Sequence, residues 1–198
     1  SRLTLIDYPV ARSAHAFPTP SGGGLVIATL FLCVAYLLNL NEYITNDLFY
    51  ALLSAAPVAG LGLFDDISHV GLRLRLPIQF FAAFWAIYYL GGVPSIDFSF
   101  LWLSNFWILT FLGIIALVWM LNLYNFMDGI DAIATAEALF VSLSTSLFAI
   151  YVGDDTLAIL SASLFAGCAG FLVWNWPPAK LFMGDVGSSF IGFLLGVF

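Results

Sequence analysis

Apolar residues occur in six long runs that polar segments separate, and a seventh run begins near residue 189. Each complete run is near the roughly 17–25 residues that a helix needs to cross a bilayer. None shows the period-two alternation of a membrane β-strand. The pattern therefore predicts an all-α, polytopic transmembrane helix bundle with six complete spans and a truncated seventh. The complete runs are about 24–40, 48–64, 77–93, 105–121, 133–152 and 157–174.

The composition agrees with this prediction. Of the 198 residues, 62% are hydrophobic and 9% are charged, and the mean hydropathy is +1.03. A soluble domain carries roughly 25% charged residues. We therefore expect residues 1–198 to form one integral-membrane domain. We expect it to contact the membrane and not to bind nucleic acid. The chain opens with a polar segment and stops within an apolar run. We therefore expect it to lack a first span and a C-terminal part of a longer protein.

The distribution of charge predicts which side each loop faces. If every run crosses once, all five basic residues and both histidines fall in one set of loops, and the other set carries only acids. Positive charge favours the cytoplasmic side. We therefore expect a multi-pass protein of the plasma membrane or bacterial inner membrane, with its site in the cytoplasm. The basic loops are 1–23, 65–76, 122–132 and 175–188, the acidic loops are 41–47, 94–104 and 153–156, and the basic residues are Arg2, Arg12, Arg73, Arg75 and Lys180.

One polar stripe stands at the end of the fourth apolar run. Asn122, Asn125, Asp128 and Asp131 recur at every third position, so on a helix they fall near one face. Polar residues at a span end are costly unless they meet water, metal or ligand. Capping residues at the interface are the alternative interpretation, and this segment alone does not decide between the two.

Carboxylates gather on the same predicted side of the membrane. Like charges repel unless a cation neutralises them, and oxygen ligands favour Mg²⁺ or Mn²⁺ over zinc. Glycine-rich turns beside basic side chains suit phosphate. Together these features are the equipment of phosphoryl transfer, and their place at the bilayer surface suggests a lipid substrate. The carboxylates are Asp65, Asp66, Asp128, Asp131 and Asp185.

Simpler interpretations exist for each of these features. An Asp–Asp pair at a span end is often an interfacial cap, as we expect for Asp154–Asp155. Arginines such as Arg73 and Arg75 more often fix the orientation of a membrane span than take part in catalysis. A histidine such as His69 is more often an ordinary loop residue than a ligand. Two rival functions also remain open, a cation-coupled transporter and a non-catalytic membrane homologue. Transporters place their acids near the bilayer midplane, whereas the acids here cluster at span ends.

At four segments the sequence resembles the polyprenyl-phosphate N-acetylhexosamine-1-phosphate transferases of glycosyltransferase family 4. These include phospho-N-acetylmuramoyl-pentapeptide transferase and the enzymes that start O-antigen synthesis. The resemblance implies transfer of a sugar 1-phosphate from a UDP-N-acetyl-sugar to a polyprenyl phosphate, with Mg²⁺ required, giving UMP and a lipid-diphosphate-sugar for the cell envelope. The four segments are Asp7 to Pro20, Gly62 to Asp66, Asn122 to Asp131, and Phe182 to Ser188.

The resemblance also implies roles for individual residues. Asp65 and Asp66 match an aspartate-rich motif, and with Asp128 they are the predicted catalytic residues; Asp65 is the best candidate if a base is used. The predicted metal ligands are Asp185, Asp128 and Asn125. The predicted substrate and phosphate contacts are Arg12, His15, Arg73, Arg75, Asn122, Asp131 and Lys180.

Three positions depart from the family pattern. Ser13 and Ser21 stand where basic residues are common, and Ala132 stands where glycine is common. The first two weaken phosphate binding by the first loop and favour the O-antigen-initiating branch, some of whose members also vary there. A cytoplasmic loop that carries histidine in the family is absent from this chain. The sequence leaves open which UDP-sugar is used and whether the protein forms a homodimer.

Overall fold

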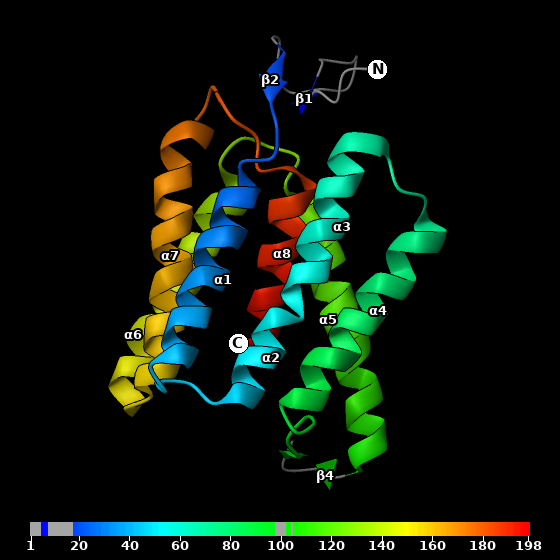
Figure 1. The fold of residues 1–198 in the computed structure, drawn as a ribbon, viewed down its shortest axis with the longest axis vertical. Coiled ribbons are helices and arrows are strands. Elements are labelled where there is room, and N and C mark those ends of the chain that lie inside the picture. Colours follow the sequence, from blue (N-terminus) through cyan, green and yellow to red (C-terminus); the bar gives the residue numbers. More distant parts are fainter. Residues whose placement is uncertain (1–4, 8–17, 98–101, 104) are drawn as a thin grey trace.

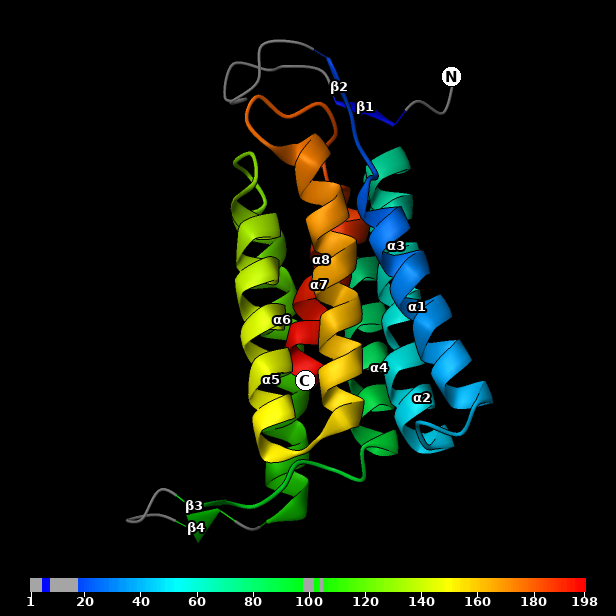
Figure 2. The same ribbon diagram turned by 90° about the vertical axis from the view of Figure 1, so that its left-hand side faces the viewer.

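The computed structural model describes residues 5–7, 18–97, 102–103 and 105–198 of the chain. Its helices run roughly alongside one another, with the strand pair β1–β2 at one end and β3–β4 at the other (Figures 1 and 2). The predicted all-α class is confirmed. The helices are α1 Gly24–Leu40, α2 Asn46–Leu53, α3 Ala55–Ser68, α4 Leu72–Tyr89, α5 Phe106–Met127, α6 Ile133–Val152, α7 Asp155–Asn175 and α8 Gly184–Val197; the strands are β1 Ile6–Asp7, β2 Thr19–Pro20, β3 Ile96–Asp97 and β4 Trp102–Leu103.

Four helical segments are long and apolar enough to cross a membrane: Asn46–Ser68, Phe106–Met127, Ile133–Val152 and Asp155–Asn175. The first of these consists of α2 and α3, which meet at Ser54. Pro57 explains the break, because it has no N–H for the carbonyl of Leu53 and its ring crowds that carbonyl. The helices α1 and α8 are apolar but shorter, so the predicted count of spans stays a prediction.

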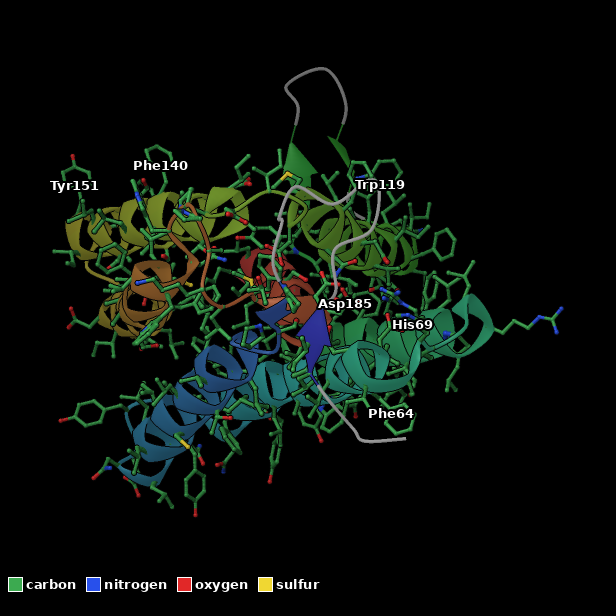
Figure 3. The ribbon with its side chains drawn as sticks, turned by 90° about the horizontal axis from the view of Figure 1, so that it is seen from above. Phe64, His69, Trp119, Phe140, Tyr151 and Asp185 are labelled. Carbon is green, nitrogen blue, oxygen red and sulfur yellow. The ribbon has the colours of Figure 1, made fainter. Side chains whose placement is uncertain are left out.

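The outer surface of the bundle is apolar. Phe140, Tyr151, Trp119 and Phe64 point away from the helices (Figure 3), and each exposes more than half of its surface. In a soluble protein such a surface would be costly, whereas a bilayer solvates it. The exposed aromatic side chains therefore agree with a membrane environment.

The helix α8 forms the centre of the bundle, where α1, α3, α5 and α6 pack against it. Every residue from Val186 to Leu194 is buried. A side chain at Gly62 of α3 would lie 2.4 Å from the carbonyl oxygen of Asp185, so α3 and the first turn of α8 approach as closely as backbones can. This packing brings the end of α3 beside the start of α8.

The helices extend further into the polar segments than the apolar runs predicted. The helix α3 continues to Ser68 and α4 begins at Leu72, so Asp65 and Asp66 lie on a helix, not in a loop. The helix α5 likewise continues to Met127 and includes Asn122 and Asn125. Backbone hydrogen bonds do not end where hydrophobicity ends, so the boundaries of an apolar run underestimate the helix.

The strands β1 and β2 cover the same end of the bundle. Ile6 pairs with Pro20 in antiparallel register. The N–H of Phe182 donates to the carbonyl oxygen of Pro20 at 2.8 Å, and the N–H of Gly23 donates to that of Phe182 at 3.0 Å. The described part of the N-terminal segment is thus attached to the segment that precedes α8.

Candidate functional site

A polar cavity of about 540 Å³ lies at the end of the bundle that β1 and β2 cover. Figure 3 looks onto this end and shows Asp185 near the middle of the helices, with His69 to one side. All five predicted carboxylates line the cavity, as does Asn125. The lining residues are Leu5, Ile6, Asp7, Ser21, Asp65, Asp66, Ile67, His69, Asn125, Asp128, Gly129, Ile130, Asp131, Asn175, Phe182, Met183, Gly184 and Asp185.

Asp66 holds the first turn of α8. Its Oδ1 accepts the N–H of Asp185 at 2.8 Å, and its Oδ2 accepts the N–H of Val186 at 3.2 Å. These N–H groups have no partner within their own helix, and a carboxylate there also meets the positive end of the helix dipole. Gly184 makes the approach possible, because its φ is +75° and a Cβ on it would lie 2.6 Å from Asp66 Oδ2. Asp66 therefore fixes where Asp185 lies.

Asp65 is held by the start of α4. One guanidinium nitrogen of Arg75 donates to Asp65 Oδ2 at 2.7 Å, and the other lies 3.7 Å from Asp185 Oδ2. The N–H of Val70 donates to the second oxygen of Asp65. Asp65 is only 7% exposed, so the ion pair with Arg75 offsets part of the cost of burying the charge of its carboxylate. Arg75 thus lies between two carboxylates that come from α3 and α8.

Asn125 connects α5 to the same turn of α8. Its Nδ2 donates to Asp185 Oδ1 and to Ser188 Oγ, each at 2.8 Å. Asp128 follows one turn later at the C-terminal end of α5. Burial, together with the negative charges of Asp185 and Asp66, raises the pKa of Asp128 to about 7. A carboxylate in this position favours a cation nearby.

The carboxylate and amide oxygens at the cavity are of the kind that binds Mg²⁺. Within the described ranges, no group of three or more His, Cys, Asp or Glu side chains is arranged to hold a metal ion. Mg²⁺ is usually bound through one or two carboxylates, and water and substrate phosphates complete its shell. Asp128 and Asp185, together with the amide oxygen of Asn125, supply such a set at the wall of an open polar cavity.

Asp131 lies in the turn between α5 and α6. Its Oδ2 accepts the N–H of Ala179 at 2.9 Å, which ties this turn to the segment between α7 and α8. Asp131 lines the cavity. One of its two carboxylate oxygens is already bound to the N–H of Ala179. Its proposed role toward substrate stays a prediction.

Several predicted contacts do not reach the cavity lining, and Asn122 is the clearest correction. Asn122 exchanges hydrogen bonds with Gln79 of α4, at 2.9 and 3.4 Å, and lies outside the lining. A three-residue step on an α-helix falls about 60° short of a full turn, so the stripe rotates and Asn122 faces α4. Arg73, Arg75 and Lys180 also lie outside the lining. Arg73 and Lys180 are exposed, whereas Arg75 pairs with the lining residues Asp65 and Asp185. Arg12 and His15 lie outside the described residues.

The cavity also includes residues that the sequence analysis left without a role. His69 was interpreted as a loop residue, yet it lines the cavity in a left-handed conformation with φ of 42°. Asp7 and Phe182 begin two of the predicted motif segments, and Ser21 departs from the family pattern at a position where basic residues are common. Asn175 had one signal, a lone amide that ends the sixth apolar run. For the other residues, nothing in the sequence distinguishes them from neighbouring loop positions.

The comparisons with known proteins agree with this geometry. Residues 48–198 match glycosyl transferase family 4. The chain is 31% identical to decaprenyl-phosphate N-acetylglucosaminephosphotransferase of Mycobacterium tuberculosis, over 98% of the chain and 53% of that protein. It is 30% identical to phospho-N-acetylmuramoyl-pentapeptide-transferase of Moorella thermoacetica, over 96% of the chain and 63% of that protein. It is 28% identical to a probable undecaprenyl-phosphate N-acetylglucosaminyl 1-phosphate transferase of Bacillus subtilis, over 99% of the chain and 55% of that protein.

The chain thus spans between 53% and 63% of the lengths of these relatives. The match to the family extends over α2 to α8, which include Asp65, Asp66, Asp128 and Asp185. None of the three names refers to O-antigen, so that branch stays a prediction. The family model and the relatives together confirm the resemblance seen in the sequence, and the chain belongs to glycosyl transferase family 4.

Proposed function

We propose that the protein containing this chain transfers an N-acetylhexosamine 1-phosphate from a UDP-sugar to a polyprenyl phosphate. One observation carries the proposal: carboxylates from α3, α8 and the α5–α6 turn line one cavity at the end of an apolar bundle, and Arg75 of α4 pairs with two of them, Asp65 and Asp185. Such a place admits a water-soluble nucleotide sugar and the headgroup of a membrane lipid. The relatives are named for transfer to decaprenyl or undecaprenyl phosphate, or for phospho-N-acetylmuramoyl-pentapeptide transfer.

In the proposed reaction, an oxygen of the lipid phosphate attacks the β-phosphorus of the UDP-sugar. The new P–O bond joins lipid to sugar phosphate, and the bond to the α-phosphate breaks and releases UMP. The second pKa of a phosphate monoester is about 6, so the attacking group is largely a dianion at neutral pH and barely needs a base. The main difficulty is repulsion between the anions, and positive charge in the cavity relieves it.

The described residues divide this work. Arg75 brings a fixed positive charge beside Asp65 and Asp185, two carboxylates that line the cavity, and Asp65 holds its guanidinium in place. Asp66 holds the first turn of α8, so that Asp185 faces the cavity beside Asn125. Asp128, Asp185 and Asn125 would hold Mg²⁺. When bound, Mg²⁺ supplies charge neutralisation at the diphosphate and the departing UMP.

The cavity is proposed to face the cytoplasm. The basic residues that the structure describes, Arg73, Arg75 and Lys180, lie in the segments at the cavity end, and α6 and α7 meet at the other end through Asp154 and Asp155. Excess Lys and Arg marks the cytoplasmic side of a membrane protein. UDP-sugars are proposed as the donors on that side, with the O-antigen-initiating branch as the finer prediction.

A panel of UDP-sugars tests the proposal. The whole protein, in membranes or detergent, is mixed with polyprenyl phosphate and each of UDP-N-acetylglucosamine, a UDP-6-deoxy-amino sugar and UDP-N-acetylmuramoyl-pentapeptide. We expect UMP to be released with one of them, only when lipid phosphate is present, and to stop when a chelator removes Mg²⁺. If none of the three UDP-sugars gives UMP, the proposed function is contradicted. Release that continues in the chelator would contradict the metal requirement alone.

A further inference from the structure

Asn175 connects three segments around the cavity. It ends α7 and is 3% exposed. Its Oδ1 accepts the N–H of Ala132 at 3.1 Å and the hydroxyl of Thr135 at 2.8 Å, and its Nδ2 donates to the carbonyl oxygen of Leu181 at 3.1 Å. The amide thus joins the start of α6, the end of α7 and the segment before α8. A buried amide with these partners holds all three together.

The backbone that Asn175 holds is strained. Ala132 has φ of +64°, the left-handed conformation that residues with a Cβ rarely adopt. Ala132 directly follows Asp131 and precedes α6, so its conformation sets the direction in which the turn leaves Asp128. A backbone held against its own preference requires surrounding contacts to maintain it. The bond from the Ala132 N–H to Asn175 is such a contact.

Thr135 supports Asn175 from outside the cavity. Its side chain is fully buried in α6 and is not among the lining residues. Its hydroxyl and the Ala132 N–H both donate to Oδ1 of Asn175, while the carbonyl of Leu181 requires the nitrogen on the other side. These three partners fix the orientation of the Asn175 amide. If the amide were turned by 180°, its NH₂ group would face the N–H of Ala132 and its oxygen would face the carbonyl oxygen of Leu181. Thr135 therefore acts through Asn175.

We propose that Thr135 and Asn175 are positioning residues that hold Ala132 in its left-handed conformation and thereby fix Asp128 and Asp131 in the cavity. The inference rests on the proposed function for the meaning of that cavity. It explains how this chain keeps alanine at a position where glycine would adopt the turn at no cost. Without the pair, the turn would spend less time in the conformation that binds substrate, and apparent affinity would fall in proportion.

The first test compares Thr135→Val with Thr135→Ser in the whole protein. The valine removes the hydroxyl at similar volume, so we expect KM for the UDP-sugar to rise about fivefold while kcat changes little. The serine keeps the hydroxyl and should restore KM. Ser146→Ala is the matched control, because it removes another buried hydroxyl of α6, which donates to the carbonyl oxygen of Ala158 at 3.0 Å, outside the cavity lining. A raised KM in Thr135→Ser as large as in Thr135→Val, or an unchanged KM in Thr135→Val, overturns the proposal.

The second test combines Asn175→Ala with Ala132→Gly. We expect Asn175→Ala to raise KM at least tenfold, and Ala132→Gly to recover about fivefold of that loss, because glycine adopts positive φ without the Cβ clash. Alone, Ala132→Gly should change KM little. If Asn175 acted only by touching the substrate, the loss would be the same with alanine and with glycine at this position, and that result overturns the proposal.

A binding measurement separates the inference from the proposed function. Calorimetry of UMP with Mg²⁺ on the same variants should show the same loss and the same partial recovery without any turnover. If the unsubstituted protein binds UMP but releases none from UDP-sugars, the proposed function fails while the binding comparison still decides the positioning role. Equal affinity for UMP in Asn175→Ala and in the unsubstituted protein would contradict the positioning role.

Discussion

Two Asp–Asp pairs stand at helix ends in this protein, and they do different work. Asp154 Oδ1 accepts the N–H of Leu157 at 2.9 Å and so caps its own helix, α7. Asp66 accepts the N–H groups of Asp185 and Val186, 119 and 120 residues away, and so holds the end of another helix. The dipeptide is the same in both places. The distance along the chain to its partner distinguishes a local cap from a site residue.

The surroundings of the two pairs differ in the same way. Asp65 is buried against Arg75 and lines the cavity, whereas Asp154 and Asp155 are exposed and lie outside the lining. A buried carboxylate needs a partner for its charge, and water serves an exposed one. Substitutions of Asp65 or Asp66 should therefore lower activity, whereas substitutions of Asp154 or Asp155 should affect only stability.

The largest expected effect is that of Asp185→Asn, which removes the negative charge of a carboxylate that lines the cavity. Asp185 is one of the residues proposed to hold Mg²⁺, whose positive charge would stabilise the transition state. We therefore expect kcat to fall about 10³-fold or more. Mg²⁺ affinity, measured by calorimetry, should fall together with kcat. Normal Mg²⁺ affinity in this variant would refute the assignment of Asp185 as a metal ligand.

The next effect is that of Asp66→Ala. Loss of both oxygens leaves two N–H groups of α8 without a cap, which costs about 1 kcal/mol of stability and lets Asp185 move. We expect UMP release to fall about 100-fold and Asp66→Asn, which keeps one acceptor oxygen, to lose about tenfold. A loss in Asp66→Asn as large as in Asp66→Ala would indicate that Asp66 acts through its charge alone.

A smaller effect is expected from Arg75→Lys. Lysine keeps the charge but lacks the planar fork that lets Arg75 reach Asp65 and Asp185 together. We expect about a tenfold loss of kcat/KM, and a larger loss in Arg75→Ala. Arg73→Lys, on the same helix and exposed, serves as the control and should leave kcat/KM unchanged. Equal rates in Arg75→Lys and the unsubstituted protein would show that only the charge matters.

The smallest effect on activity is that of Asp154→Ala. It removes a helix cap and should lower the free energy of unfolding by about 1 kcal/mol, with no change in UMP release. Thermal unfolding in detergent measures the first effect and the UMP assay the second. A loss of activity in Asp154→Ala beyond the loss of folded protein would break the comparison between the two pairs.

The sequence alone predicted the class of fold and the gathering of the carboxylates. Long apolar runs, and basic residues confined to alternate loops, indicate a membrane protein. The thickness of the bilayer sets the length of each span, and the cytoplasmic side favours basic loops. The break between α2 and α3 was not predicted, although Pro57 within the second apolar run is a local signal for it. These features depend on local composition, so they needed no knowledge of packing.

What the sequence could not predict depends on partners far along the chain. Asn122 turns to Gln79, 43 residues away, and leaves the cavity. His69 and Asn175 enter it because of how α3 and α7 end. The role of Asp66 as a cap for α8 requires the close approach of α3 at Gly62. Tertiary packing decides each of these, and spacing along one segment does not encode it.

Transfer of a labelled β-phosphate tests the central claim most directly. The UDP-sugar that succeeds in the panel is prepared with radioactive phosphorus at the β-position and mixed with the whole protein and polyprenyl phosphate. The account predicts that the label passes into the lipid fraction as UMP appears, in the unsubstituted protein and in Asp154→Ala but not in Asp185→Asn. Label that stays in water-soluble products, or that enters the lipid equally fast in Asp185→Asn, would contradict it.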